Sequence, residues 1–191
     1  STAFAASYSL EKAVEVGLYE AIERCAYVRS VQSENWGASY EGGLCDKLSQ
    51  VLQRYRLRPT TFALPPVVPG VEVALVAIRD HTGETPELTV GLAARPTMLG
   101  ASRSATLEAL QIRNWLLRSQ RLNDAGNLGA SDPALTRAWY WASKGRGAHL
   151  LAKLRGNSRT LESMGRDTSE VAACSLRSVV SSMREQQMSP L

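Results

Sequence analysis

The residues nearest the start of the chain that could carry chemistry are Glu20, Glu23 and Arg24, followed by Tyr27. With Glu20 set at 0° and about 100° per residue in an α-helix, Glu23 falls near −60° and Arg24 near +40°. Tyr27 falls at about −20°, so all four side chains share one helical face. Two carboxylates one turn apart can hold a divalent cation through oxygen ligands, and the guanidinium can bind a phosphate. From spacing alone, an i,i+4 salt bridge between Glu20 and Arg24, worth about 0.3–0.5 kcal/mol, is the favoured interpretation.

A second, weaker cluster lies in the segment around residue 110. Glu108 and Gln111 are one helical turn apart and share their face with Ile112, Trp115 and Ser104. Polar groups that are buried among Ile and Trp need hydrogen-bonding partners. This pattern fits the second wall of a ligand site and fits a partly exposed helix edge about equally well.

Cysteine and histidine chemistry finds little support in the sequence. The three cysteines are far apart without a CxxC pair, and the two histidines lie on separate segments: Cys25, Cys45, Cys174, His81 and His149. This sparse, odd count argues against a disulfide framework and a zinc site, and it favours a reducing compartment. No GxGxxG or Walker-type loop and no defensible nucleophile constellation is present.

Composition indicates an ordinary globular chain. The 191 residues are 44% hydrophobic and carry a net charge of +4, from 22 basic and 18 acidic residues. No apolar run approaches the ~20 residues of a membrane-spanning helix. The basic residues between Lys144 and Arg159 are read as a solvated helix face, because no aromatic residues alternate with them. We therefore expect a cytoplasmic protein that binds neither nucleic acid nor membranes.

The element that must position the first cluster is a long helix over residues 9–30, with Ser9 as its N-cap. Its apolar residues form a stripe centred at about 100–120° on the scale above. This places the glutamates and Arg24 on the flank of the expected buried face. The stripe consists of Leu10, Val14, Leu18, Ala21, Cys25 and Val28.

The rest of the chain predicts a mixture of helices and strands. We expect a loop over 32–43, a helix over 44–55, and strands over 61–64, 71–79 and 87–93, the last two as an antiparallel hairpin. Further helices are expected over 102–119, after Asp132 with an interruption near 145–147, and over 169–183. The order predicts an α+β fold with an antiparallel sheet packed against several helices, as one domain over 1–191.

Several segments, in order, resemble the YcaO-domain family. The stretch STAFAASYSLEKAVEVGLYEAIERCAY resembles the family pattern S-N-G-L-A-A-G-N-x-x-E-E-A-x-x-x-x-L-x-E-x-I-E-R-D-A. VALVAIRDHTGETPELTVGLAARP is similar to the family's strand pair, and ASRSATLEALQIR to its A-x-x-R-A-L-T-E-A-x-Q-x-R helix. SLRSVVSSMREQQMSPL looks like its late helix. The resemblance implies the second half of a YcaO-like domain, with the family's earlier Gly-rich segment and first paired glutamates expected before Ser1.

The resemblance implies a definite chemistry. YcaO domains bind ATP and Mg²⁺ in a site made largely of carboxylates and phosphorylate the oxygen of a peptide backbone amide. In azoline-forming members a Cys, Ser or Thr side chain of the peptide attacks the carbonyl of that amide. Other members use external sulfide to make thioamides. Metal ions offset the charge of the transferring phosphoryl group. Carried over to this sequence, the resemblance implies that Glu20 and Glu23 hold Mg²⁺-ATP and that Arg24 faces phosphate. Glu108 and Gln111 match the acidic and amide positions of the family's later helix.

The chain departs from the family pattern at four informative positions. Tyr8 stands where the family has Asn, and Lys12 replaces the second Glu of E-E-A. Cys25 replaces the Asp after ExxER, and Ser104 replaces the Arg of R-A-L-T-E. Arg103 is adjacent to Ser104, but one residue is about 100° around a helix.

Two functions follow from this balance. One is part of an ATP-dependent enzyme that modifies peptide backbones in natural-product biosynthesis. The other is a degenerate, non-catalytic module that binds a precursor peptide or a partner enzyme. An unrelated α+β domain that happens to contain ExxER is the least favoured interpretation. The expected partners are a peptide substrate and another protein chain or a missing half-domain, with a homo-oligomer as an open alternative.

Overall fold

A five-stranded sheet with strand order β4-β3-β2-β1-β5 lies at the centre of the molecule. The computed structural model describes residues 8–40, 44, 46–124, 138–140, 142–156 and 159–160. The described helices are α1 (Leu10–Ser33), α2 (Asp46–Arg54), α3 (Met98–Asp124) and α5 (Arg146–Gly156). The strands are β1 (Ala38–Tyr40), β2 (Leu57–Ala63), β3 (Glu72–Asp80), β4 (Leu88–Arg95) and β5 (Arg159–Thr160). Strands β1 to β4 pair antiparallel, and β5 joins β1 in parallel.

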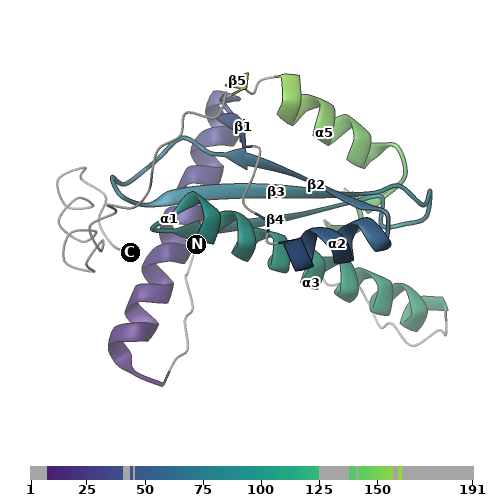
Figure 1. Cartoon of the computed structure of the whole chain (residues 1–191), viewed down its shortest axis with the longest axis horizontal. Helices are drawn as coiled ribbons and strands as arrows, with labels where there is room; N and C mark the ends of the chain where they lie inside the picture. The colour runs from purple at the N-terminus through teal and green to yellow at the C-terminus, as the bar shows by residue number, and fades with distance from the viewer. Residues whose placement is uncertain are drawn as a thin grey trace.

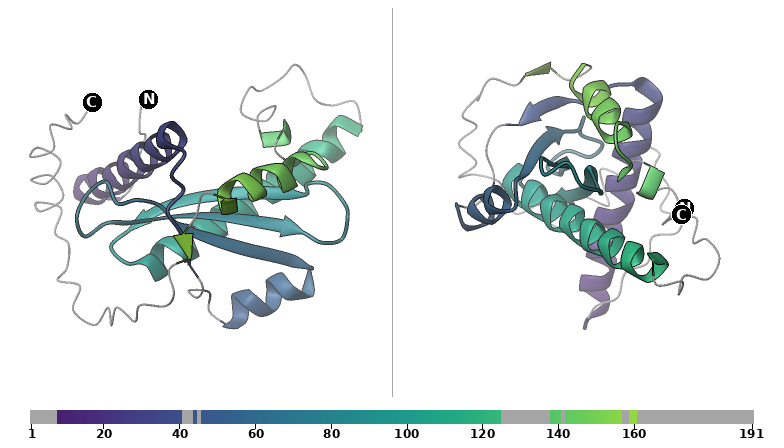
Figure 2. Two further views of the ribbon diagram at one scale, coloured as in Figure 1. Left: turned by 90° about the horizontal axis from the view of Figure 1, so that it is seen from above. Right: turned by 90° about the vertical axis from the view of Figure 1, so that its right-hand side faces the viewer.

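Both faces of the sheet are covered, which explains the continuous apolar run in β3. Val73 and Leu75 belong to a core cluster shared with α1 and α5, whereas Ala74 and Val76 pack with α2 and α3. Side chains alternate between the faces of a strand, so a strand buried on both sides is apolar throughout. Figures 1 and 2 show the resulting layers, with α1 and α5 on one face of the sheet and α2 and α3 on the other.

The expected hairpin of β3 and β4 is present and sets the position of α3. Leu75 faces Leu92, and Val76 faces Gly91. A Cβ atom on Gly91 would lie 2.0 Å from the carbonyl oxygen of Ala105, so only glycine allows the backbone of α3 to approach β4 this closely. The α+β fold with an antiparallel sheet is therefore confirmed.

Two segments differ from the sequence prediction. The expected loop over 32–43 contains the short strand β1, which has no strong alternation of its own and pairs with the end of β2. Strand β2 begins at Leu57 rather than at residue 61 and includes Pro59. Proline is tolerated there because β1 pairs only with residues 61–63, which leaves one side of Pro59 without a neighbouring strand. The helices expected after Asp132 and over 169–183 lie largely or wholly outside the described residues.

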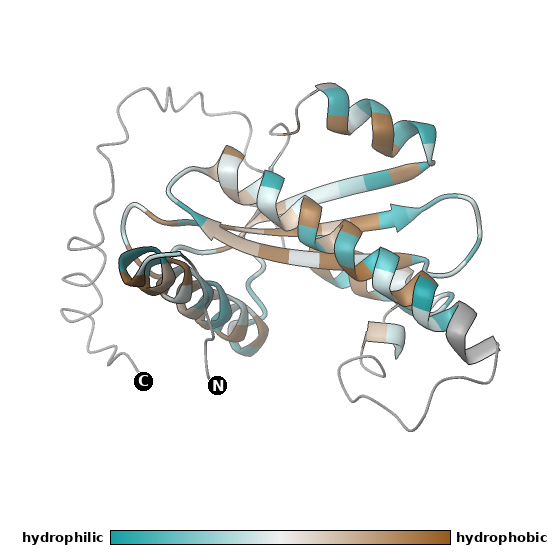
Figure 3. Ribbon diagram, turned by 90° about the horizontal axis from the view of Figure 1, so that it is seen from below, coloured by the Kyte–Doolittle hydropathy of each residue, from teal (hydrophilic) through white to brown (hydrophobic). Residues whose placement is uncertain are grey.

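The apolar stripe predicted for α1 is only partly right. Leu18 and Cys25 pack against the core, but Leu10, Val14 and Val28 are 82%, 43% and 49% exposed. The fully buried residues of α1, Ile22, Ala26 and Ser30, lie between about −160° and −80° on the same angular scale. Only the C-terminal half of α1 packs on the sheet, and its first turns extend past β4, so apolar residues there meet no core (Figures 1 and 3).

The helix break near 145–147 is confirmed. Gly145 adopts φ +85°, in the left-handed region, and α5 begins at the next residue. Among the helices of the described part, none is long and apolar enough to cross a membrane.

Candidate functional site

Three glutamates from two helices influence one another beside β4. Glu20 and Glu23 lie on α1, and Glu108 lies on α3. Strand β4 is the edge strand of the sheet, and both helices pack against it, one from each face. The negative charges of Glu108 and Glu20 both act on Glu23. The two clusters, which lie far apart in the sequence, therefore form one acidic site.

Glu23 is the centre of this acidic site. At about −60° on the helical scale it borders the buried face of α1, whereas Glu20, the origin of that scale, lies farther from the buried face. Burial raises the pKa of Glu23 to about 8 from its ordinary value of 4.5, and the charges of Glu108 and Glu20 add to the rise. Near neutral pH the side chain therefore holds a proton unless a cation replaces it.

Glu108 is fixed by the edge of the sheet. The backbone N–H of Leu92 in β4 donates a hydrogen bond of 2.8 Å to its Oε2. Burial raises the pKa of Glu108, while this hydrogen bond and the charge of Arg95 oppose the rise. The edge strand thus orients one oxygen of the carboxylate and leaves Oε1 for another partner.

Two arginines balance the glutamates. Arg24 forms an ion pair with Glu20, the i,i+4 bridge that the spacing favours, at a half-exposed position. Arg95, at the end of β4, is a site residue that the sequence patterns do not mark. Its guanidinium lies 5.9 Å from the centroid of the Tyr19 ring on α1, and its charge lowers the pKa of both Glu23 and Glu108. A lone arginine at the end of a predicted strand is a weak signal in sequence.

Gln111 is the remaining residue of the predicted site. Its side chain is exposed, one turn farther along α3 than Glu108. Its assignment as a ligand-binding residue therefore stays a prediction.

The donor set suits a hard cation that is shared with a ligand. Within the part of the chain that is described, no three carboxylate, imidazole or thiolate groups are close enough to surround one ion. Mg²⁺ binds through one or two carboxylates, waters and substrate phosphates rather than in an all-protein cage. Glutamates whose charge is incompletely balanced, with arginines beside them, fit Mg²⁺ held jointly with a nucleotide.

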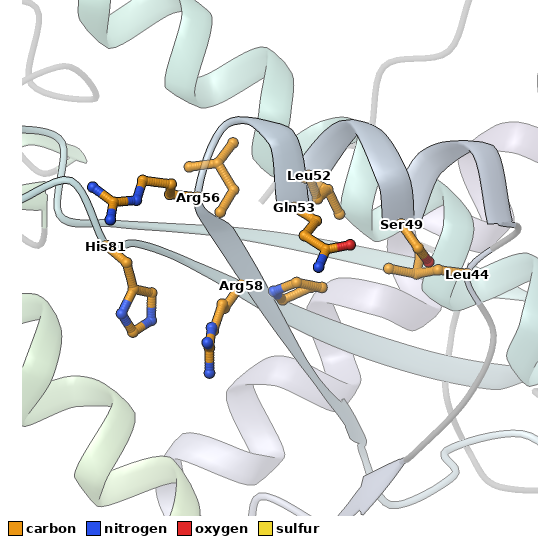
Figure 4. A pocket seen from close by; sticks show the side chains of 9 residues that line it. Leu44, Ser49, Leu52, Gln53, Arg56, Arg58 and His81 are labelled. Carbon is orange, nitrogen blue, oxygen red and sulfur yellow. The ribbon is translucent and has the colours of Figure 1, made fainter.

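A separate cavity of about 630 Å³ lies between α2 and the start of β2 (Figure 4). Arg56 and Arg58 supply its cationic side chains, and His81, Gln53 and Ser49 supply further polar groups. None of the site residues expected from the sequence lines it. It is therefore distinct from the acidic site.

Solved structures support the fold. The chain is similar to YcaO from Methanopyrus kandleri bound with AMPPCP and Mg²⁺, with 25% identity and a TM-score of 0.54 over 62% of this chain and 32% of that chain. It is also similar to the E. coli microcin synthetase McbBCD complex, with 14% identity and a TM-score of 0.63 over 81% of this chain and 40% of that chain. A heterocyclase in complex with substrate and cofactor gives 18% identity and a TM-score of 0.56 over 78% and 19%. The chain thus spans less than half the length of each.

Two comparisons at the level of sequence give different results. No curated protein sequence matches the chain significantly. The model of the family described as YcaO cyclodehydratase, ATP- and Mg²⁺-binding, matches residues 1–191. That description agrees with the ATP and Mg²⁺ expected above, and the match covers the whole chain. The chain belongs to the YcaO family.

Proposed function

We propose that this chain provides the carboxylate wall of an Mg²⁺-ATP site with which a YcaO-type enzyme activates peptide backbone amides. The observation that carries the proposal is the convergence of Glu20, Glu23 and Glu108 on one partly buried site. Carboxylates that share a site of low solvation repel one another, and a divalent cation relieves that repulsion.

Each residue has a definite task in this proposal. Glu20 and Glu23 bind the metal ion, and Glu108, on the opposite side of β4, keeps Oε1 available to the bound nucleotide and its waters. Metal binding at Glu20 competes with the ion pair to Arg24, which frees that guanidinium to contact a phosphate. When bound, ATP supplies the phosphoryl group that makes an amide oxygen a good leaving group. The chain's own residues hold and orient the reactants.

The peptide substrate and partner chains are also part of the proposal. One neighbouring structure is the microcin synthetase complex with pro-MccB17 bound, a multichain assembly with its peptide. An azoline forms when a Cys, Ser or Thr side chain of the peptide attacks the activated amide. A thioamide forms when sulfide does.

The alternative, a non-catalytic binding module, rests on the departures at Tyr8, Lys12 and Ser104. Tyr8 is fully exposed, and Lys12 forms an exposed 2.7 Å ion pair with Glu15. Eight residues separate Lys12 from Glu20, which is about 12 Å along a helix. Ser104 alone lies close to the glutamates, one turn before Glu108. Because Tyr8 and Lys12 lie away from the glutamates, the catalytic proposal stays favoured.

Calorimetric titration of Mg²⁺-ATP into the full-length protein tests the binding step. Wild-type protein is expected to bind, and Glu23→Gln is expected to weaken binding by at least about tenfold, since it deletes a charged ligand. Glu11→Gln, an exposed glutamate on the same helix, serves as the matched control. Absence of binding to wild-type protein in the presence of its partner chains would favour the non-catalytic module.

An isotope experiment tests the reaction itself. With oxygen-18 in the backbone amide of a peptide substrate, activation by phosphorylation must place the label in the released phosphate. Label that stays in the peptide or enters water would contradict amide phosphorylation.

A further inference from the structure

Arg95 lies where α1, β4 and α3 meet. It is the last residue of β4, and its guanidinium stacks 5.9 Å from the centroid of the Tyr19 ring on α1. Its aliphatic stem lies against the start of α3, where a Cβ on Gly100 would be 3.5 Å from Arg95 Cβ and 3.7 Å from its Cγ. The side chain therefore spans the space between the two helices that carry the glutamates.

The neighbours of Arg95 on α3 follow one ridge. Gly100, Ser104 and Glu108 are spaced by four residues, so they line up along the same side of the helix. The stem of Arg95 lies at the first of these positions, and the acidic group lies at the third. Ser104, half-buried and short, occupies the position between them.

The neighbours on α1 follow the same spacing. Tyr19 and Glu23 are four residues apart, so the ring beneath the guanidinium of Arg95 lies one turn from the central carboxylate. The positive charge of Arg95 reaches both Glu23 and Glu108. Nη1 of Arg95 donates a 2.6 Å hydrogen bond to the carbonyl oxygen of Ala94, so the guanidinium is held at the end of the edge strand while its charge acts on the acidic site.

We propose that Arg95 is a phosphate-binding arginine of the nucleotide site, supplied from the end of β4. This inference rests on the function proposed above and assigns the residue that recognises the nucleotide's phosphates. The glutamates that attract a metal ion also repel a polyphosphate, so the site needs cations that can turn towards the phosphates. A guanidinium does this with two parallel hydrogen bonds, which an ammonium does not match.

Binding of two probes distinguishes this role from a structural one. In the full-length protein, Arg95→Ala is expected to weaken Mg²⁺-AMPPCP binding by about 10- to 100-fold, because a charged hydrogen bond is lost. The same variant is expected to bind Mn²⁺ alone as tightly as wild type or more tightly, because a cation beside the carboxylates is gone. Arg95→Lys keeps the positive charge but cannot form two parallel hydrogen bonds. Its affinity for Mg²⁺-AMPPCP should lie between those of wild type and Arg95→Ala.

A relocated arginine provides the rescue. Ser104→Arg in the Arg95→Ala background is expected to restore most of the AMPPCP affinity, because it places a guanidinium on the same ridge one turn before Glu108. The matched control is Arg103→Ala, which removes an exposed arginine one position away and should leave binding unchanged.

The outcomes separate the inference from the proposed function. If wild-type protein binds no AMPPCP, the proposed function fails. If wild-type protein binds and Arg95→Ala binds equally well, the inference fails and the proposed function stands. Loss of both Mn²⁺ and AMPPCP binding in Arg95→Ala, with a lowered Tm and no rescue by Ser104→Arg, would mean a structural role and would overturn the inference.

Discussion

At the scale of single residues, the proposed function requires Glu23 to exchange a proton for a cation. Burial and two neighbouring glutamates raise its pKa to about 8, so the metal-free site is protonated at neutral pH. A carboxylate must lose its proton to bind a metal, so cation binding and deprotonation are linked.

The first prediction follows from that linkage. The affinity of the full-length protein for Mg²⁺-ATP is expected to rise as the pH is raised from 6 through about 8, with release of protons on binding. Titration calorimetry in buffers of different ionisation enthalpy measures the number of protons released. An affinity that is flat over this range, or falls with pH, would contradict Glu23 as a metal ligand.

The second prediction concerns stability without metal. The folded protein holds the Glu23 proton more tightly than the unfolded chain does, so this contribution to stability is complete below about pH 4.5 and is lost as the pH rises through about 8. Glu23→Gln keeps a neutral side chain, so the metal-free variant should have a higher Tm than wild type at pH 8.5. Each kcal/mol gained in unfolding free energy should raise the Tm by roughly 2–4 °C. At pH 4.5 the two should melt alike. A variant that melts lower than wild type at pH 8.5 would contradict the buried position of this carboxylate.

Sequence reasoning found four of the five main charged residues of the site, and its limit is instructive. ExxER and TLEALQIR mark Glu20, Glu23, Arg24 and Glu108, because helical periodicity shows which residues share a face. Arg95 was not predicted, because it joins the site only where the end of β4 lies beside α1 and α3. Spacing within one segment of the sequence does not show such a meeting of three elements. The burial of each glutamate could not be predicted either, because the apolar pattern of α1 does not show which side of the helix packs on the sheet.

At the scale of elements, the contact between β4 and α3 fixes Glu108 against Leu92. Gly91 is the point of closest approach, with the backbone of α3 occupying the space of a side chain. Gly91→Ala should lower the free energy of unfolding by about 1–3 kcal/mol, because the helix must move away from the strand. Urea denaturation measures this, and Gly100→Ala, where the nearest atom to a new Cβ is the side-chain oxygen of Thr97 at 3.1 Å, is the comparison. Equal effects at the two positions would argue against the close contact.

The far end of the same hairpin is held by a buried ion pair. The side chain of Asp80 is fully buried and accepts a 2.5 Å hydrogen bond from Arg113 of α3, which also donates to the carbonyl of Pro86 at 3.0 Å. Arg113→Ala should cost about 3–5 kcal/mol of unfolding free energy, because it leaves the Asp80 carboxylate without its counter-ion. Arg118→Ala, on an exposed position of α3, should change it by less than about 0.5 kcal/mol. Similar losses in the two variants would contradict a structural role for this pair.

The elements themselves were largely predictable, for physical reasons that differ along the chain. Ser9 caps α1 as expected, with its hydroxyl accepting the N–H of Lys12, and the β-branched run of β3 identified a buried strand. Strand β1 was missed because three residues carry too little alternation and depend on the pairing with β2. The apolar stripe of α1 misled because periodicity cannot tell which part of a long helix meets the core.

At the scale of the whole molecule, the site joins the two layers that the sheet separates. Glu20 and Glu23 come from the layer of α1, and Glu108 comes from the layer of α3. A ligand bound by all three therefore links two helices that pack on opposite faces of β4.

This arrangement predicts a pattern of amide hydrogen exchange. Mg²⁺-AMPPCP should slow exchange in residues 19–26 of α1 and 100–111 of α3 together, because ligand binding raises the free energy of local opening in both. Residues 46–54 of α2, beside the separate cavity, should exchange at unchanged rates. Protection confined to α2 would place the nucleotide in that cavity instead.

The hydrogen bond from Leu92 to Glu108 has a consequence for the choice of metal. With one lone pair of Oε2 engaged by the strand, Glu108 is expected to present mainly Oε1 to a ligand. Ca²⁺ favours six to eight ligands and often grips both oxygens of a carboxylate, whereas Mg²⁺ accepts single oxygens in a tight octahedron. In the proposed site, a carboxylate held by β4 should therefore favour the smaller ion. We expect Ca²⁺ to replace Mg²⁺ poorly.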